Sequence, residues 1–221
     1  KKKKAMEQQG NDDASNSMLI PADVVKVISC EVPTLQYAFD NGFKNFVQAH
    51  SPDIICLQVQ NEKNKSKKQG KEKNIDKSKI CDQINTKYHI EGYKGCIITD
   101  FNAILEEPGT YETIIFTKIN PIKVSRIDDD EEINSIMTIE FTNFFIVNAI
   151  SPGQTESEEN VTKWFEKLQK LVNDLNSQKT TILCGNFKVA HKDLDVVNVS
   201  HFFDYYADSS NRKRFSDFLS D

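Results

Sequence analysis

Several features are missing from the 221-residue sequence, and each absence excludes a class of protein. No run of 18 apolar residues occurs, so no segment is predicted to cross a membrane as a helix. The N-terminal stretch "KKKKAMEQQGNDDASNSM" has basic residues without an apolar region behind them, which argues against a secretion signal. A Gly-rich phosphate-binding loop and a Cys-x-x-Cys metal spacing are also lacking. We therefore expect a soluble protein without a secretion signal.

The five cysteines favour free thiols over disulfides or metal ligands. Cys30, Cys56 and Cys184 lie at or near the ends of apolar, strand-like runs, where a thiol behaves as a small apolar side chain. Buried free thiols are typical of a reducing, intracellular compartment. The sequence leaves open whether that compartment is the nucleus, the cytoplasm or an organelle matrix.

Positive charge is concentrated in two polar segments. Lys1 to Lys4 and the segment "EKNKSKKQGKEKNIDKSK" at 62–79 hold 12 of the 28 basic residues, although the net charge is −5. The rest of the chain then has a charge of about −14, which would repel nucleic acid. We expect a polar tail at 1–22, followed by one domain at 23–221 with a Lys-rich insertion at 62–79.

Strand and helix patterns alternate along the chain. Apolar runs predict strands near 24–30, 53–59, 144–150 and 180–185. Apolar residues at helical spacing predict helices near 35–50 and 157–176, and Thr142-Asn143 fits a hairpin turn. The first helix would place Leu35, Phe39, Phe43, Phe46 and Val47 on one stripe, and the second would bury Trp164. Neighbouring strands interrupted by helices predict two stacked β-layers with helices outside.

Five segments resemble, in order, the motifs of the exonuclease III and apurinic/apyrimidinic (AP) endonuclease branch of the endonuclease/exonuclease/phosphatase superfamily. They are "KVISCEVPTL", similar to K-I-x-S-W-N-V-[DN]-G-L; "SPDIICLQVQNEK", similar to x-P-D-I-L-C-L-Q-E-T-K; "NPIKVSRI", similar to x-P-L-K-V-x-x-G-I; "NAISPGQ", similar to T-A-Y-V-P-N; and "LCGNFKVAHKDLDV", similar to L-C-G-D-L-N-V-A-H-x-x-I-D-L. The resemblance covers residues 24 to 197. It implies an α/β fold, the DNase I-like four-layer α/β-sandwich of two packed mixed β-sheets flanked by helices.

The resemblance fails at the positions that carry the family's chemistry. The family cleaves phosphodiesters with a Mg²⁺ on a carboxylate, an Asp and an Asn near the attacking water, and a Tyr and a His at the phosphate. The corresponding residues here are Glu31, Val59, Ile150, Gly153, Asn186 and Lys188. Val59 has no lone pair for a metal, an amide at Asn186 cannot act as a general base, and the Lys188 ammonium opposes Mg²⁺ binding.

The family also continues for about 70 to 80 residues beyond "RFSDFLSD", through W-R-x-D-Y and S-D-H motifs that do not occur in this sequence. His191 follows the Ala of the fifth motif, a position that favours a structural role. We therefore expect a C-terminally incomplete sandwich with an open sheet edge. Either other protein chains cover that edge, or the sequence is a fragment of a longer polypeptide.

Three functions remain as alternatives. The first is a protein that is not an enzyme, a pseudonuclease with six vestigial positions that serves as a structural or protein-interaction subunit; it would have no catalytic residues, cofactor or metal. The second is a non-catalytic nucleic-acid-binding protein that uses its Lys-rich segments. The third is a divergent Mg-dependent DNA repair endonuclease in which Glu31, Asp193 or Asp195 is recruited as a metal ligand, although such acids more often cap turns and helices.

The sequence also makes one prediction about the geometry of the old metal site. In the family, the positions of Glu31 and Lys188 both face the pocket where metal and phosphate meet, although they are 157 residues apart. One residue is now acidic and the other basic, and a lone buried charge would be costly. We predict that they form an internal ion pair that replaces Mg²⁺. The alternative is an open cleft in which both side chains point into water.

Overall fold

The computed structural model describes residues 24–60, 86–97, 111–126, 136–152, 157–195 and 209–220. Its strands are β1 (Val27–Val32), β2 (Ile54–Gln60), β3 (Lys94–Ile97), β4 (Tyr111–Thr117), β5 (Lys123–Arg126), β6 (Ile136–Glu140), β7 (Phe144–Ile150) and β8 (Thr180–Asn186). Its helices are α1 (Leu35–Asp40), α2 (Phe43–His50), α5 (Glu158–Asn176) and α6 (Ser209–Ser220), with a 3₁₀ turn η1 at Asp193–Asp195. The tail at 1–22, the insertion at 62–79 and Gly153 lie outside the described residues.

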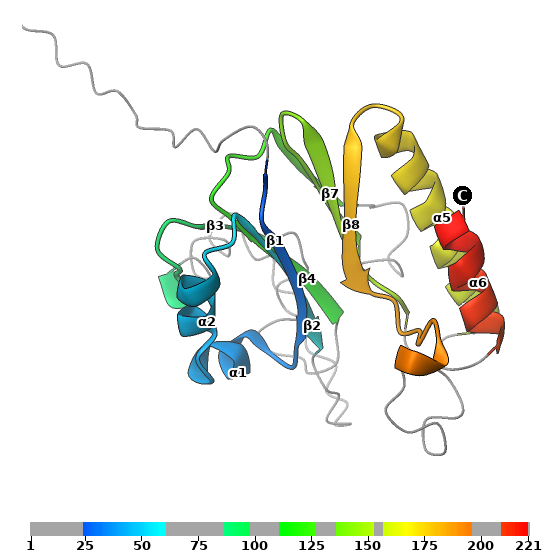
Figure 1. Cartoon of the computed structure of the whole chain (residues 1–221), viewed down its shortest axis with the longest axis horizontal. Helices are drawn as coiled ribbons and strands as arrows, with labels where there is room; N and C mark the ends of the chain where they lie inside the picture. The colour runs from blue at the N-terminus through cyan, green and yellow to red at the C-terminus, as the bar shows by residue number, and fades with distance from the viewer. Residues whose placement is uncertain are drawn as a thin grey trace, which may run out of the picture.

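Two four-stranded mixed sheets pack face to face (Figure 1). Sheet A has the order β1-β2-β4-β3, with β1 and β2 parallel and the other pairs antiparallel. Sheet B has the order β5-β6-β7-β8, with β7 and β8 parallel and the other pairs antiparallel. Helices α1 and α2 cover the outer face of sheet A, and α5 and α6 cover that of sheet B (Figure 1). The expected four-layer sandwich is therefore confirmed.

Three apolar cores hold the four layers together. One lies between sheet A and helices α1 and α2, the second between the sheets, and the third between sheet B and helices α5 and α6. The strands at the centre of each sheet are mostly apolar on both faces, because each of those faces is covered. Trp164 is buried in the third core, as its place on the helical stripe predicts.

The predicted elements agree with the structure, apart from shifts at some ends and one broken helix. Helix α5 begins after Ser157, whose hydroxyl accepts a hydrogen bond from the backbone N–H of Asn160 at 3.2 Å, and it ends at Asn176. The turn at Thr142-Asn143 joins the antiparallel strands β6 and β7, as the hairpin prediction requires. Among the described residues, no helix has the length and apolar character needed to span a membrane.

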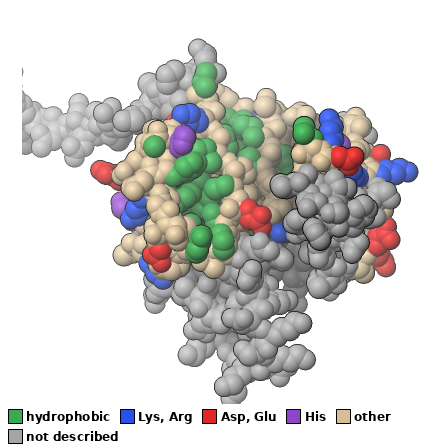
Figure 2. All heavy atoms as spheres, turned by 60° about the horizontal axis from the view of Figure 1, so that its bottom comes forward, with side chains coloured by type: hydrophobic (Ala, Val, Ile, Leu, Met, Phe, Trp, Pro, Cys, Tyr) green, Lys and Arg blue, Asp and Glu red, His purple; other side chains and the backbone are tan. Residues whose placement is uncertain are grey.

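The single helix predicted at 35–50 is wrong, because the chain breaks it into α1 and α2. Gly42 stands between them with φ of 90°, a conformation that glycine adopts without steric cost. The apolar face of α2 is then set by Phe43 and Val47, and Phe46 is 42% exposed instead of buried. Apolar side chains, shown in green, are visible on this part of the surface (Figure 2).

A polar bridge crosses the apolar layer between the sheets. The Gln58 side-chain amide on β2 donates to Asn148 Oδ1 on β7 at 2.7 Å and to Ser29 Oγ at 3.1 Å. The Asn148 amide donates in turn to the carbonyl oxygens of Leu57 at 3.0 Å and Ile114 at 3.3 Å. Both amides are buried, so these bonds replace those that water would make, and they fix the position of one sheet on the other.

Removal of the Asn148 amide should weaken the fold. Asn148→Ala leaves the Gln58 amide and two backbone carbonyls without this partner, so we expect the free energy of unfolding to fall by about 1–3 kcal/mol for each group left unpaired. Urea denaturation measures the change. Gln169→Ala is the control, because it removes an exposed amide–amide bond on α5 and should have little effect. Equal stability of the two variants would contradict this role of the bridge.

The position of Gly185 on β8 has no room for a side chain. A Cβ there would lie 2.3 Å from the carbonyl oxygen of Ala149 on β7. We expect Gly185→Ala to lower the free energy of unfolding by about 1–3 kcal/mol, because β7 and β8 must separate to admit it. Thr180→Ala, at the exposed start of the same strand, should change stability little. If thermal and urea unfolding do not distinguish the two variants, the close approach is not a constraint.

Candidate functional site

The C-terminal ends of β1 and β8 meet where the two sheets face each other. Glu31 is the penultimate residue of β1, Asn186 is the last residue of β8, and Lys188 follows two positions later. We call these three residues the mouth. Functional groups often lie at the carboxyl ends of strands in α/β proteins, because the chain leaves the sheet there.

A tight turn after β8 directs Lys188 back toward sheet A. The backbone N–H of Lys188 donates to Asn186 Oδ1 at 3.1 Å, an Asx-type turn that Asn favours. Lys188 has φ of 55°, a left-handed conformation that is uncommon for a residue with a long side chain. Its side chain is only 5% exposed, so the turn places a charged group inside the protein.

The ion pair predicted from the sequence is confirmed. Lys188 Nζ lies 3.3 Å from Glu31 Oε1, and the Glu31 side chain is 41% exposed. The alternative, in which both side chains point into water, is wrong for Lys188. A buried ammonium without a negative charge nearby would be strongly unfavourable, so Glu31 compensates a charge that the turn after β8 has buried.

The inter-sheet layer next to the mouth contains two thiols with opposite pKa shifts. The hydrogen bond from Cys56, supported by one from Ser29, lowers the pKa of Cys184 although its burial acts in the other direction. The same thiol–thiol hydrogen bond, together with burial, raises the pKa of Cys56 well above its usual value. Cys184 on β8 is two residues before Asn186, and Ser29 on β1 is two residues before Glu31, so this thiol pair lies close to the mouth.

The structure does not bring all six positions implied by the resemblance together. Val59 is buried beside Val32 in the core between sheet A and helices α1 and α2, away from the ion pair. Ile150 is also buried, at the end of β7 beside Asn186. The mouth therefore combines a carboxylate, an amide and an ammonium, while Val59 and Ile150 are apolar.

The residues present do not fit the Mg²⁺ that the family implies. Mg²⁺ needs oxygen ligands in octahedral geometry, whereas the mouth offers one carboxylate that is already paired with an ammonium. In the described ranges no group of three or more His, Cys, Asp or Glu side chains has metal-binding geometry. Asp193 bonds to Arg212 at 2.6 Å, and Asp195 accepts from the backbone of Lys192 at 2.8 Å. These two acids stabilise the turn η1 and its contact with α6.

His191 also contributes to the packing of α6. Its Nε2 lies 3.0 Å from Ser216 Oγ, and its ring packs edge-on against Phe215.

The polar bridge of Gln58 and Asn148 was not predicted from the sequence. The available signal was an amide in the middle of each of two apolar strands, "IICLQVQ" and "FFIVNAI".

Curated proteins that resemble this chain are nucleases and a repair protein. A DNA-(apurinic or apyrimidinic site) endonuclease of Dictyostelium discoideum is 26% identical over 186 residues, which are 79% of this chain and 44% of that protein. An exodeoxyribonuclease of Bacillus subtilis is 24% identical over 188 residues, or 79% of this chain and 62% of that protein. Recombination repair protein 1 of Drosophila melanogaster is 23% identical over 83% of this chain and 25% of its own length. The chain thus spans less than two thirds of these relatives, and no family model matches it.

Solved structures show the same fold. A 3' phosphatase from Neisseria, bound to a product DNA hairpin, has a TM-score of 0.65 and 16% identity, with 89% of this chain matched to 71% of that one. An AP endonuclease from Archaeoglobus fulgidus also has a TM-score of 0.65 and 16% identity, with 89% of this chain matched to 70% of that one.

The comparisons correct one expectation. The changed positions led us to expect a protein that is not an enzyme, but two of the three curated relatives above are named as nucleases, which points to an enzyme. The resemblance and the fold expected from the five motifs are both confirmed. The chain resembles the exonuclease III and AP endonuclease branch of the endonuclease/exonuclease/phosphatase superfamily and has its DNase I-like fold.

Proposed function

We propose that this chain is a divergent DNA repair nuclease that works as a subunit of a larger protein assembly, with another protein chain completing its sheets along β1 and β8. The observation that carries the proposal is the mouth itself. It lies where β1 and β8 end, and it contains a buried cation and a carboxylate, groups that can bind a phosphate and accept a proton.

The named relatives support DNA as the substrate class. One is an endonuclease of apurinic or apyrimidinic sites, one is an exodeoxyribonuclease, and a structural neighbour is a 3' phosphatase bound to a DNA hairpin. The expected electrostatic repulsion from the acidic part of the chain is reduced where Lys188 replaces a neutral residue of the family motif. A reducing, intracellular compartment fits both a DNA substrate and the free thiols of Cys30, Cys56 and Cys184.

The assembly part of the proposal rests on two strand edges. In the described part of the chain, β1 ends the hydrogen-bonded order of sheet A, β8 ends that of sheet B, and the two strands contact each other across the sandwich (Figure 1). The Lys26 carbonyl accepts from Ile54 on β2, so by the alternation of a parallel ladder Ser29 and Glu31 direct their backbone groups away from β2. The Asn186 carbonyl accepts from Ser151 next to β7.

By the same alternation, Leu183 and Gly185 direct their backbone groups away from β7. The side chains of both strands also resemble those of interior strands. The sequence "VISCEV" is mostly apolar, and "TTILCGN" has an apolar centre. Together they contain one acid and no proline or lysine, although edge strands usually carry charges or prolines that prevent pairing. Ile28, Ile182 and Leu183 are only partly buried. A strand contributed by another chain would pair with the outward backbone groups and cover these side chains.

The proposed activity predicts dependence on the mouth. A duplex oligonucleotide with one abasic site should be incised by the assembly purified from cells through a tag on this chain. Both Lys188→Gln and Glu31→Gln should lower the incision rate by roughly tenfold or more, because each removes a charged group from the site. Lys179→Gln, at the other end of β8, is the control. Absence of incision above background, or incision unchanged in both mouth variants, would refute the proposed activity.

The proposed edge predicts a pattern of amide hydrogen exchange. In the isolated chain, the outward N–H groups of Ser29, Glu31, Leu183 and Gly185 should exchange faster than those of Cys30 and Cys184, which face β2 and β7. In the purified assembly the outward groups should become protected, since a paired strand shields them. Mass spectrometry of short peptides with residue-level fragmentation measures both states. Equally fast exchange of the outward groups in chain and assembly would show that no strand is added there.

A further inference from the structure

The mouth covers its buried cation with its own anion. The Lys188 side chain is 5% exposed and that of Glu31 is 41% exposed, so the carboxylate is the solvent-facing member of the pair. The carboxylate belongs to sheet A and the ammonium to the turn that follows sheet B. An anion that approaches Lys188 from solvent must therefore compete with Glu31 for the ammonium.

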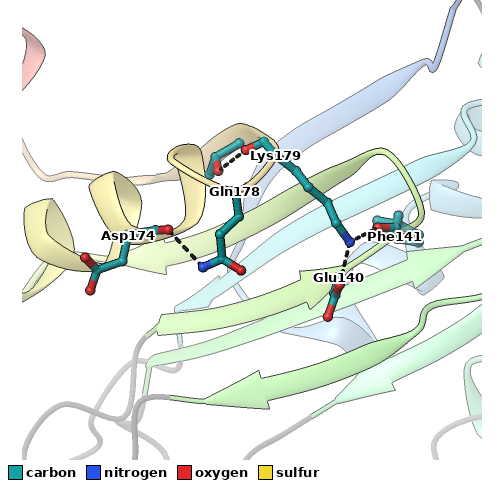
Figure 3. Close-up of polar contacts among 6 residues, drawn as sticks. Glu140, Phe141, Asp174, Gln178 and Lys179 are labelled. Atoms are coloured by element: carbon teal, nitrogen blue, oxygen red, sulfur yellow. Dashed lines mark hydrogen bonds and ion pairs between the residues drawn. The ribbon is translucent and has the colours of Figure 1, made fainter.

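A second lysine at the opposite end of β8 shows a different arrangement. Lys179, which precedes the strand, lies 2.5 Å from Glu140 Oε1 and donates to the carbonyl oxygen of Phe141 at 3.2 Å (Figure 3). Both side chains of this pair are 27% exposed. The Lys179 pair is thus evenly exposed, and the Lys188 pair combines a buried cation with an exposed anion.

We infer that Lys188 binds a phosphate group of the DNA backbone without a divalent cation, and that the Glu31 carboxylate takes the place of this phosphate when no DNA is bound. The inference rests on the proposed function for DNA as the source of that phosphate. The mouth does not fit the Mg²⁺ that the family implies. The positive charge at this place belongs instead to a side chain of the protein, so the inference requires no metal.

The exchange of one anion for the other is physically reasonable. A half-exposed carboxylate that leaves the ammonium regains contact with water, and this hydration offsets part of the attraction that it gives up. The ammonium keeps a charge-assisted hydrogen bond, because the phosphate oxygen replaces the carboxylate oxygen. Glu31 remains close to the bound phosphate, however, and its negative charge opposes binding. Glu31 is therefore a built-in competitor of the ligand.

A binding experiment with matched variants tests the inference. The probe is a fluorescein-labelled DNA duplex, titrated with the full chain in EDTA and again in Mg²⁺, and read by fluorescence anisotropy. We expect Glu31→Gln to tighten binding by roughly two- to tenfold, because the competing charge is removed while the side chain keeps its shape. Lys188→Gln should weaken binding to a similar extent. EDTA and Mg²⁺ should give the same affinity for the wild-type chain.

The second ion pair provides the matched controls. Glu140→Gln and Lys179→Gln change the same residue types at the other end of β8 and should leave the affinity unchanged. Circular dichroism checks that each variant is folded. If Lys188→Gln does not fold, the direction of the Glu31→Gln effect decides, because that variant leaves the ammonium in place.

Four results would overturn the inference. Binding that requires Mg²⁺ would show that a metal supplies the charge, and unchanged or weaker binding by Glu31→Gln would show that Glu31 is no competitor. Wild-type affinity in folded Lys188→Gln would place DNA on another surface, such as the Lys-rich segments, and would leave the proposed function standing. Absence of DNA binding by the wild-type chain and by Glu31→Gln would reject the inference and the DNA part of the proposed function together.

Discussion

A buried ammonium must have a negative charge within reach, and much of the structure around the mouth follows from this requirement. The turn after β8 places Lys188 inside the protein, where its ammonium lies 3.3 Å from the Glu31 carboxylate. Because Glu31 lies near the end of β1 in the other sheet, the two sheets must approach each other closely at this point. The need to compensate the buried charge therefore also limits where sheet A can lie on sheet B.

The polar bridge of Gln58 and Asn148 fixes the same alignment from inside the layer. Apolar packing between two sheets tolerates small shifts, since the hydrophobic effect is not directional. Hydrogen bonds of 2.7 to 3.3 Å between buried amides and backbone carbonyls tolerate far less. The apolar layer supplies most of the stability, and the bridge and the ion pair determine how the sheets are aligned.

The mouth differs from the corresponding family site in the groups that carry its charge. In the family motifs a neutral Asn stands at both positions, so the charge there comes from a bound metal. In this chain the positive charge is carried by Lys188 and the negative charge by Glu31. Such a site is present as soon as the chain folds, whereas a metal site depends on an ion from solution.

The sequence by itself determined the sandwich, because the apolar period of each strand and of α5 is local and the five motifs occur in the family's order. It also determined the Glu31–Lys188 pair, since opposite charges at two positions known to face one pocket leave few other solutions. Only the tertiary structure decided that the first helix breaks at Gly42, that Val59 packs beside Val32 away from the mouth, and that Gln58 meets Asn148. These features depend on backbone conformation and on contacts between segments distant in sequence. A local pattern can mark a buried amide, but it does not identify the partner of that amide.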